Sequence, residues 1–258
     1  KGASWRSEQL TYIAKVLHER NSSEEFSYLI QSAKNELLDI ERNSENQLFI
    51  KDKERNINLL LKEFNRERNL DPKLVESLAQ AKSKGYESWQ EAKKKSDFNI
   101  FLPLFEELVK LRIEEAKQIS DQYSPWETLA QPFEPELTLK WLNKMFQPLK
   151  EIFPDLIRGI KKSKKIYWDL SPESQQNLST QILDEFGRDK DQVVGGKSPQ
   201  PFSITLGPND YRITTRFVKG EPLSSFLATA HEWGHSIYEQ GLPSKSHQWF
   251  AWPLGQAT

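Results

Sequence analysis

The sequence contains no cysteine. Disulfide bonds and cysteine-ligated metal sites are therefore excluded, and the absence fits a reducing compartment. No apolar run approaches the roughly 20 residues that a membrane-spanning helix needs. We therefore expect a cytoplasmic protein that does not act at a membrane.

The sequence also has little net charge. Lys and Arg total 36 against 37 Asp and Glu, which gives a formal net charge of -1. This balance removes the electrostatic argument for nucleic acid as a partner. At 258 residues the chain is long enough to bury a large core. It begins without Met and ends in PLGQAT directly after an aromatic-rich stretch, so we expect it to be truncated at both ends.

Residues 1–190 predict one helix after another. Apolar residues recur at helical spacing, as in the stripe that runs from Phe98 to Arg112. Residues 137–160 predict a further helix, with breaks at Pro148 and Pro154. Local start signals of the capping-box or Asp/Ser-Pro type precede several of the segments. These signals are Ser22-Ser23-Glu24-Glu25, Asp71-Pro72 and Ser171-Pro172.

The composition changes near residue 190. Two short runs, Phe202–Leu206 and Tyr211–Val218, are separated by Gly-Pro-Asn-Asp and predict a β-ribbon. A helix is expected from Pro222 to Tyr238. We therefore predict a helical region over residues 1–190, followed over residues 191–258 by a ribbon and a further helix of the same domain.

The expected helix carries His-Glu-x-x-His at His231, Glu232 and His235. Positions i and i+4 share one helix face, so the two imidazoles can bind one metal ion. Glu232, beside the first ligand, can hold a water without binding the metal itself. Two neutral nitrogen ligands, a free carboxylate and an open position are what metal-assisted hydrolysis requires. A chance occurrence is a poor explanation, because the chain has only four histidines.

The remaining positions of this region are less specific. The opposite helix face, with Phe226, Leu227, Trp233 and Ile237 among its members, is expected to be buried. His18 is expected to be an ordinary surface residue. The fourth histidine, His247, lies near the motif, but a loop histidine among aromatic residues is more often packed or solvated than a ligand.

The second predicted strand alternates polar and apolar positions. Asp210, Arg212 and Thr214 fall on one strand face. Such a strand can pair with an extended peptide, and its Arg can orient a carboxylate or stiffen the ribbon through Asp210. A surface ribbon with alternating polar residues remains the alternative.

DYRITTRF followed by HEWGHSIYEQGL resembles the metallocarboxypeptidases of the carboxypeptidase Taq type. The family's Asp-x-Arg-x-Thr motif matches Asp210, Arg212 and Thr214, and its zinc motif matches His231, Glu232 and His235. Weaker similarity extends upstream, through SDFNIFLPLFEELVKLR. The resemblance implies a mainly α, multi-helix metallopeptidase of the zincin type, with a short β-ribbon before the zinc helix.

The resemblance also implies a homodimer that removes single amino acids from peptide C-termini, using one zinc ion or sometimes cobalt. It implies a glutamate as third ligand, a few residues beyond Thr258. One position departs from the family, which commonly has His-Pro-Phe where this chain has Gln200-Pro201-Phe202. Gln cannot protonate near neutral pH, so only a hydrogen-bonding role of that position would survive.

These features predict a zinc carboxypeptidase in which Glu232 is the general base. Two alternatives stay open from the sequence. An endo-acting zinc oligopeptidase would use the same helix, and a helical chain without a third ligand would be inactive and serve only in binding or assembly. Arg212 and Arg216 are the local candidates for binding a substrate carboxylate.

Overall fold

The computed structural model describes residues 2–41, 47–160, 168–207 and 209–242. It divides the chain into two compact units, residues 1–138 and 139–258. The predicted change near residue 190 lies inside the second unit, where strand β1 (Val193–Lys197) follows the last helix before the sheet. None of the described helices is long and apolar enough to cross a membrane.

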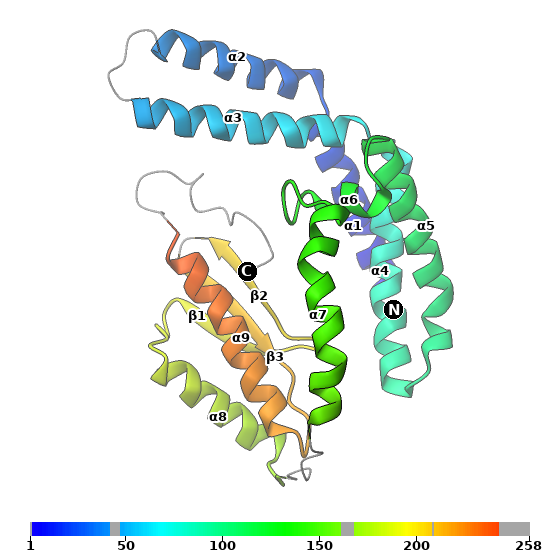
Figure 1. The fold of residues 1–258 in the computed structure, drawn as a ribbon, viewed down its shortest axis with the longest axis vertical. Helices are drawn as coiled ribbons and strands as arrows, with labels where there is room; N and C mark the ends of the chain where they lie inside the picture. The colour runs from blue at the N-terminus through cyan, green and yellow to red at the C-terminus, as the bar shows by residue number, and fades with distance from the viewer. Residues whose placement is uncertain (1, 42–46, 161–167, 208, 243–258) are drawn as a thin grey trace. The chain divides into compact units, whose positions relative to one another are not determined.

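The first unit is helical, as expected (Figure 1). Helix α1 packs against α4, and α4 packs against α5. Helices α2 and α3 pack against each other and lie side by side. The elements of this unit are α1 (Ala3–Asn21), α2 (Glu24–Glu41), α3 (Gln47–Arg68), α4 (Pro72–Lys95), the 3₁₀ helix η1 (Phe98–Ile100), α5 (Leu102–Ile119) and α6 (Pro125–Ala130).

Local capping explains where these helices begin. Asp71 accepts a hydrogen bond from the Lys73 backbone N–H at 2.7 Å, and Pro72 is the first residue of α4. Helix α6 begins in a similar way. A capping box between Ser124 and Glu127 starts it.

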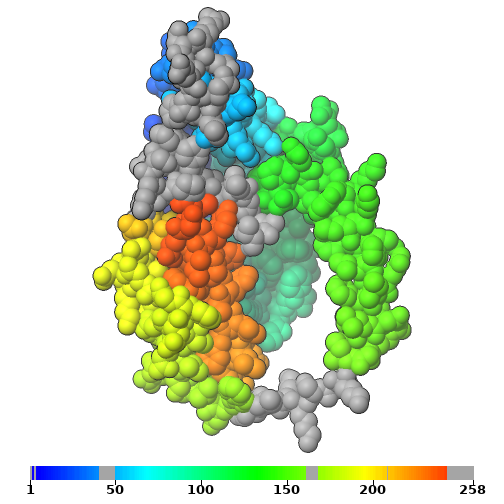
Figure 2. All heavy atoms as spheres, turned by 60° about the vertical axis from the view of Figure 1, so that its left-hand side comes forward, coloured from blue at the N-terminus to red at the C-terminus, as the bar shows by residue number. Residues whose placement is uncertain are grey.

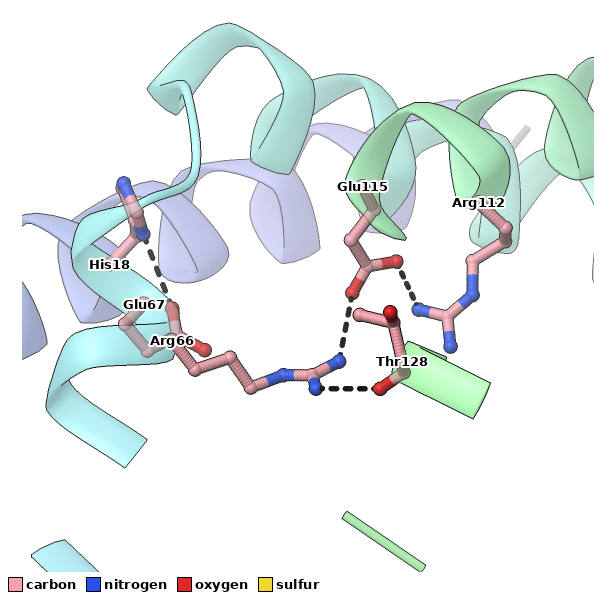
Figure 3. A network of polar contacts seen from close by, with 6 residues as sticks. All are labelled: His18, Arg66, Glu67, Arg112, Glu115 and Thr128. Carbon is pink, nitrogen blue, oxygen red and sulfur yellow. Dashed lines mark hydrogen bonds and ion pairs between the residues drawn. The ribbon is translucent and has the colours of Figure 1, made fainter. Parts of the chain in front are cut away.

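A buried polar network joins four helices of the first unit (Figure 3). On one side, Nδ1 of His18 lies 3.2 Å from Glu67 Oε2. On the other, Arg66 bonds the carbonyl of Thr128 and pairs with Glu115, which Arg112 also contacts. His18 is only 3% exposed, so the expectation of a surface histidine is wrong. The carboxylate that satisfies it comes from α3, far away in the sequence.

The second unit combines helices with a small sheet. Its helix α7 was expected to break at Pro148 and Pro154 but is continuous through both. None of its residues is buried, so water can solvate the carbonyls that lose their bonding partners to proline. The elements are α7 (Leu139–Gly159), α8 (Pro172–Glu185), β1 (Val193–Lys197), β2 (Phe202–Gly207), β3 (Asp210–Thr215) and α9 (Pro222–Gln240).

The sheet has the order β1-β3-β2, with β3 parallel to β1 and antiparallel to β2. The predicted ribbon corresponds to β2 and β3, and β1 is a third strand that was not predicted. Tyr211 and Ile213 on β3 face a core that also contains Leu183, Val193 and Trp233. Helices α8 and α9 therefore cover this face of the sheet (Figure 1). In Figure 2 the atoms of α9 (orange) lie directly beside those of the sheet and α8 (yellow).

Candidate metal centre

The two motif histidines lie on the solvent side of α9. His231 is exposed and His235 is half-buried, one helical turn further along. Their Nε2 atoms are 3.1 Å apart, and the two rings are perpendicular, with centroids separated by 4.7 Å. The i, i+4 spacing of the motif thus turns both imidazoles toward one point.

This arrangement fits a divalent metal ion. A tetrahedral site with metal–nitrogen distances of about 2.0–2.1 Å places two ligand nitrogens roughly 3.3–3.4 Å apart. The observed separation of 3.1 Å needs an adjustment of only a few tenths of an ångström. In the absence of metal the same two atoms can share one proton as a hydrogen bond.

Glu232 lies on a different side of the same helix. Its residue is 7% exposed and belongs to the face that packs against the sheet and α8, next to the exposed His231. Its side chain has no hydrogen bond or ion pair with any group in the described parts of the chain. A buried carboxylate that pairs with none of the described residues is suited to accept a proton from a water or a substrate group.

The buried face of α9 differs from the predicted one. Leu227 and Ile237 were expected inside but are 70% and 50% exposed, whereas Trp233 is buried as expected. Besides Pro222, Trp233 and Glu232, the buried side chains are the small hydroxyl residues Ser225, Thr229 and Ser236. The hydropathy pattern predicts the wrong buried face, because it counts only apolar residues. The hydroxyl groups of Ser225, Thr229 and Ser236 can be buried because they form hydrogen bonds within the unit.

Glu239 follows His235 by one further turn on the same side of α9. The pKa of Glu239 is raised above its ordinary value, because partial burial outweighs the opposite effect of the nearby His235. The sequence analysis did not single out this residue, although its i+4 spacing from His235 was visible there.

Among the described residues, the structure brings no third ligand to the two histidines. Within the described ranges, no group of three or more His, Asp or Glu side chains is placed to hold a metal ion. His247, the sequence candidate nearest the motif, lies outside the described residues. The glutamate that the resemblance implies beyond Thr258 remains a prediction.

Asp210 and Arg212 form a bidentate ion pair on the other face of the sheet. Arg212 Nε and Nη2 donate to the two Asp210 carboxylate oxygens at 2.8 and 3.0 Å. Since Tyr211 and Ile213 between and beside them face α9, strand alternation directs this pair away from the metal helix. The hydrogen bond from Arg212 lowers the pKa of Asp210.

Thr214 connects β3 to the segment between β1 and β2. Its Oγ1 lies 2.6 Å from Ser198 Oγ and accepts a hydrogen bond from the Phe202 backbone N–H at 3.2 Å. Ser198 in turn donates to the carbonyl of Gln200, the position where the family commonly has His. Within the Asp-x-Arg-x-Thr motif, Thr214 therefore connects β3 to the turn that carries Gln200, whereas Asp210 and Arg212 pair with each other.

The whole chain, residues 1–258, matches the family described as carboxypeptidase Taq (M32) metallopeptidase. Carboxypeptidase 1 of Bacillus subtilis is 34% identical over 166 residues, which cover 62% of this chain and 33% of that protein. Thermostable carboxypeptidase 1 of Thermus thermophilus is 28% identical over 272 residues, covering 100% of this chain and 51% of that protein. The chain thus spans about half the length of these relatives or less.

The fold comparison agrees. A crystal structure of the protein named BsuCP superposes with a TM-score of 0.81 at 28% identity, over 93% of this chain and 48% of that one. This likeness confirms the expected mainly α architecture, with its small sheet before the motif helix. The chain therefore belongs to the carboxypeptidase Taq (M32) family of metallopeptidases.

Proposed function

We propose that the protein is a metallocarboxypeptidase that releases C-terminal amino acids from peptides. The observation that carries this proposal is the convergence of His231 and His235 on one point of α9, with Glu232 on the adjoining, buried side of the same helix. Family membership and the names of the relatives support peptide hydrolysis from the C-terminus. The proposal concerns the whole protein, because the chain corresponds to only part of its relatives' length.

In this proposal His231 and His235 hold a divalent metal ion, preferentially zinc, through their Nε2 atoms. Such an ion, when bound, supplies Lewis acidity that activates water and polarises a carbonyl group. Glu232 accepts the proton of the attacking water and donates it to the leaving amine. Because Glu232 has no ion-pair partner within the described parts of the chain, its carboxylate breaks no ion pair with them when it accepts the proton.

Asp210, Arg212 and Thr214 have a supporting role in this proposal. Thr214 holds β3 to the segment between β1 and β2, while Arg212 and Asp210 pair with each other within β3, on the sheet face that α9 does not cover. We assign Arg212 to stiffening the ribbon, because its guanidinium already pairs with Asp210. Arg216 remains the other local candidate for that carboxylate.

The test compares two peptides of one sequence, one with a free C-terminus and one amidated. We expect the metal-loaded protein to shorten the free peptide one residue at a time, with products followed by mass spectrometry, and to leave the amidated peptide largely intact. Internal cleavage of the amidated peptide would instead identify an endo-acting oligopeptidase. No cleavage of either peptide, with metal bound, would favour the inactive chain that serves only in binding or assembly.

Glu232→Gln provides the control for the mechanism. The variant keeps the size of the side chain and both histidines, so we expect it to bind metal normally. Loss of general base catalysis should lower kcat by about 10²–10⁴-fold. Wild-type turnover in this variant with metal bound would contradict the assigned role.

We further propose a homodimer in the cytoplasm. The dimer rests on the resemblance alone, and the location on the lack of cysteine, which is compatible with a reducing compartment. Sedimentation equilibrium measures the dimer directly, and a mass of one chain at micromolar concentration would contradict it.

A further inference from the structure

Gln175, in the first turn of α8, is completely buried between α8 and the chain segment that leads into α9. Its amide makes three hydrogen bonds. Nε2 donates to the carbonyls of Val218 at 2.8 Å and Leu170 at 3.1 Å, and Oε1 accepts from Ser225 Oγ at 2.5 Å. Both N–H groups and the carbonyl of the amide are thus used.

These three partners belong to three different segments. Leu170 precedes α8, Val218 lies in the connection from β3 to α9, and Ser225 is in the first turns of α9. Ser225 is itself fully buried, and its Oγ also lies 3.2 Å from the carbonyl of Arg216. One side chain therefore ties the start of α9 to the body of the unit.

The start of α9 depends on this tie because it has little other polar support. The N-cap residue, Glu221, makes no side-chain capping bond. Further along the same face, Thr229 Oγ1 donates to the Ser225 carbonyl at 2.8 Å and lies 2.9 Å from Thr215 Oγ1 on β3. A row of hydrogen bonds thus runs along α9 from Gln175 through Ser225 and Thr229, in the direction of His231.

Hydrogen bonds of this kind fix the rotation of a helix. The buried hydroxyl residues of α9 are too small to lock it by interdigitation, and Trp233 is its only large apolar side chain within the described core. An α-helix rises about 1.5 Å per residue, so His231 lies about 9 Å along the axis from Ser225. Because the helix is rigid, a rotation about its axis at Ser225 also rotates His231. The two Nε2 atoms would then point away from their present common direction.

We propose that Gln175 is a positioning residue of the metal centre, which sets the rotation of α9 and thereby the direction of His231 and His235. The inference rests on the proposed function, because it gives the two histidines the role of metal ligands. Groups that hydrogen-bond directly to metal ligands commonly change metal affinity by about 10–100-fold when they are removed. Gln175 acts through the backbone of α9, so its effect belongs at the lower end of that range.

The test measures the affinity for Co²⁺ from its visible absorption, at a temperature where every variant is folded. Gln175→Leu keeps the bulk of the side chain but removes all three hydrogen bonds, so we expect Co²⁺ affinity to fall about tenfold. Gln176→Leu is the matched control, because Gln176 is the next residue along the chain and its side chain is exposed. We expect that variant to bind Co²⁺ as the wild type does.

A second control separates positioning from stability. Glu115→Gln disturbs the buried network of the first unit, so it should lower the melting temperature without changing Co²⁺ affinity. Ser225→Ala removes one bond of Gln175 and should lower affinity less than Gln175→Leu. The double variant Gln175→Leu/Ser225→Ala should bind no more weakly than Gln175→Leu alone, because both act through the same contact.

Each outcome decides the question. Unchanged Co²⁺ affinity in folded Gln175→Leu overturns the inference and leaves the proposed function intact. If that variant does not fold, Ser225→Ala decides in its place, and unchanged affinity there has the same meaning. A wild-type protein that binds no Co²⁺ overturns the metal site itself, and the inference with it.

Discussion

At the residue scale, Glu115 is the anionic centre of the buried network in the first unit. It is 6% exposed and faces two guanidinium groups, those of Arg66 and Arg112. Burial lowers the pKa of Arg66, and the Glu115 charge opposes that effect. Replacing the carboxylate would leave both cations without a buried counter-charge.

We therefore expect Glu115→Gln to lower the free energy of unfolding by about 1–3 kcal/mol. Glu114→Gln is the matched control, since Glu114 is an exposed neighbour on the same helix. That control should change stability by less than about 0.5 kcal/mol. Urea unfolding of both variants checks the difference, and equal effects would show that the network does not stabilise the unit.

Asp210 predicts a dependence of stability on pH. Its pKa is lowered by Arg212, so the ionised form is favoured in the folded protein. The resulting stabilisation is fully present above the unfolded pKa of about 3.9 and is lost as the pH falls through the folded pKa. Asp210→Asn should therefore lose less stability than the wild type between about pH 5 and pH 2.

Melting temperatures across this acid range measure the effect. Asp191→Asn is the control, because Asp191 is exposed and its carboxylate has no ion-pair partner in the described parts of the chain. It should follow the wild-type acid profile more closely than Asp210→Asn does. Identical acid profiles for Asp210→Asn and the wild type would contradict the assignment.

At the scale of elements, the start of α4 depends on one cap. Asp71 satisfies the Lys73 backbone N–H, so Asp71→Ala should cost about 0.5–2 kcal/mol of stability. Asp71→Asn keeps an oxygen acceptor and should cost much less. Urea unfolding of the pair tests this, and equal losses would mean that the side-chain bond does not contribute.

The same local chemistry explains which elements were predictable. The starts of α2, α4 and α8 were predictable because each signal lies within four residues of the helix start. The signal is a capping serine for α2, and a capping residue followed by proline for α4 and α8. Strand β1 was missed because VVGGK has two glycines and becomes a strand only by pairing with β3. The continuity of α7 through two prolines was missed because its exposed backbone can be solvated, which no local rule anticipates.

At the scale of the whole molecule, the candidate site was predictable where it is local. His231, Glu232 and His235 lie within five residues of one helix, and helical geometry alone brings the two imidazoles together. Gln175 could not be found this way, because its contact with Ser225 spans 50 positions. The burial of His18 depends likewise on Glu67, 49 positions away. Only the folded chain shows such pairs.

The account as a whole depends on His231 and His235 binding one metal ion. The most direct measurement is the zinc content of the protein after equilibrium dialysis, compared with His231→Ala and His235→Ala. We predict one zinc ion per chain in the wild type and a large loss in either variant, with both variants folded. Equal zinc content in all three proteins, or none in the wild type, would contradict the metal centre on which the proposed function rests.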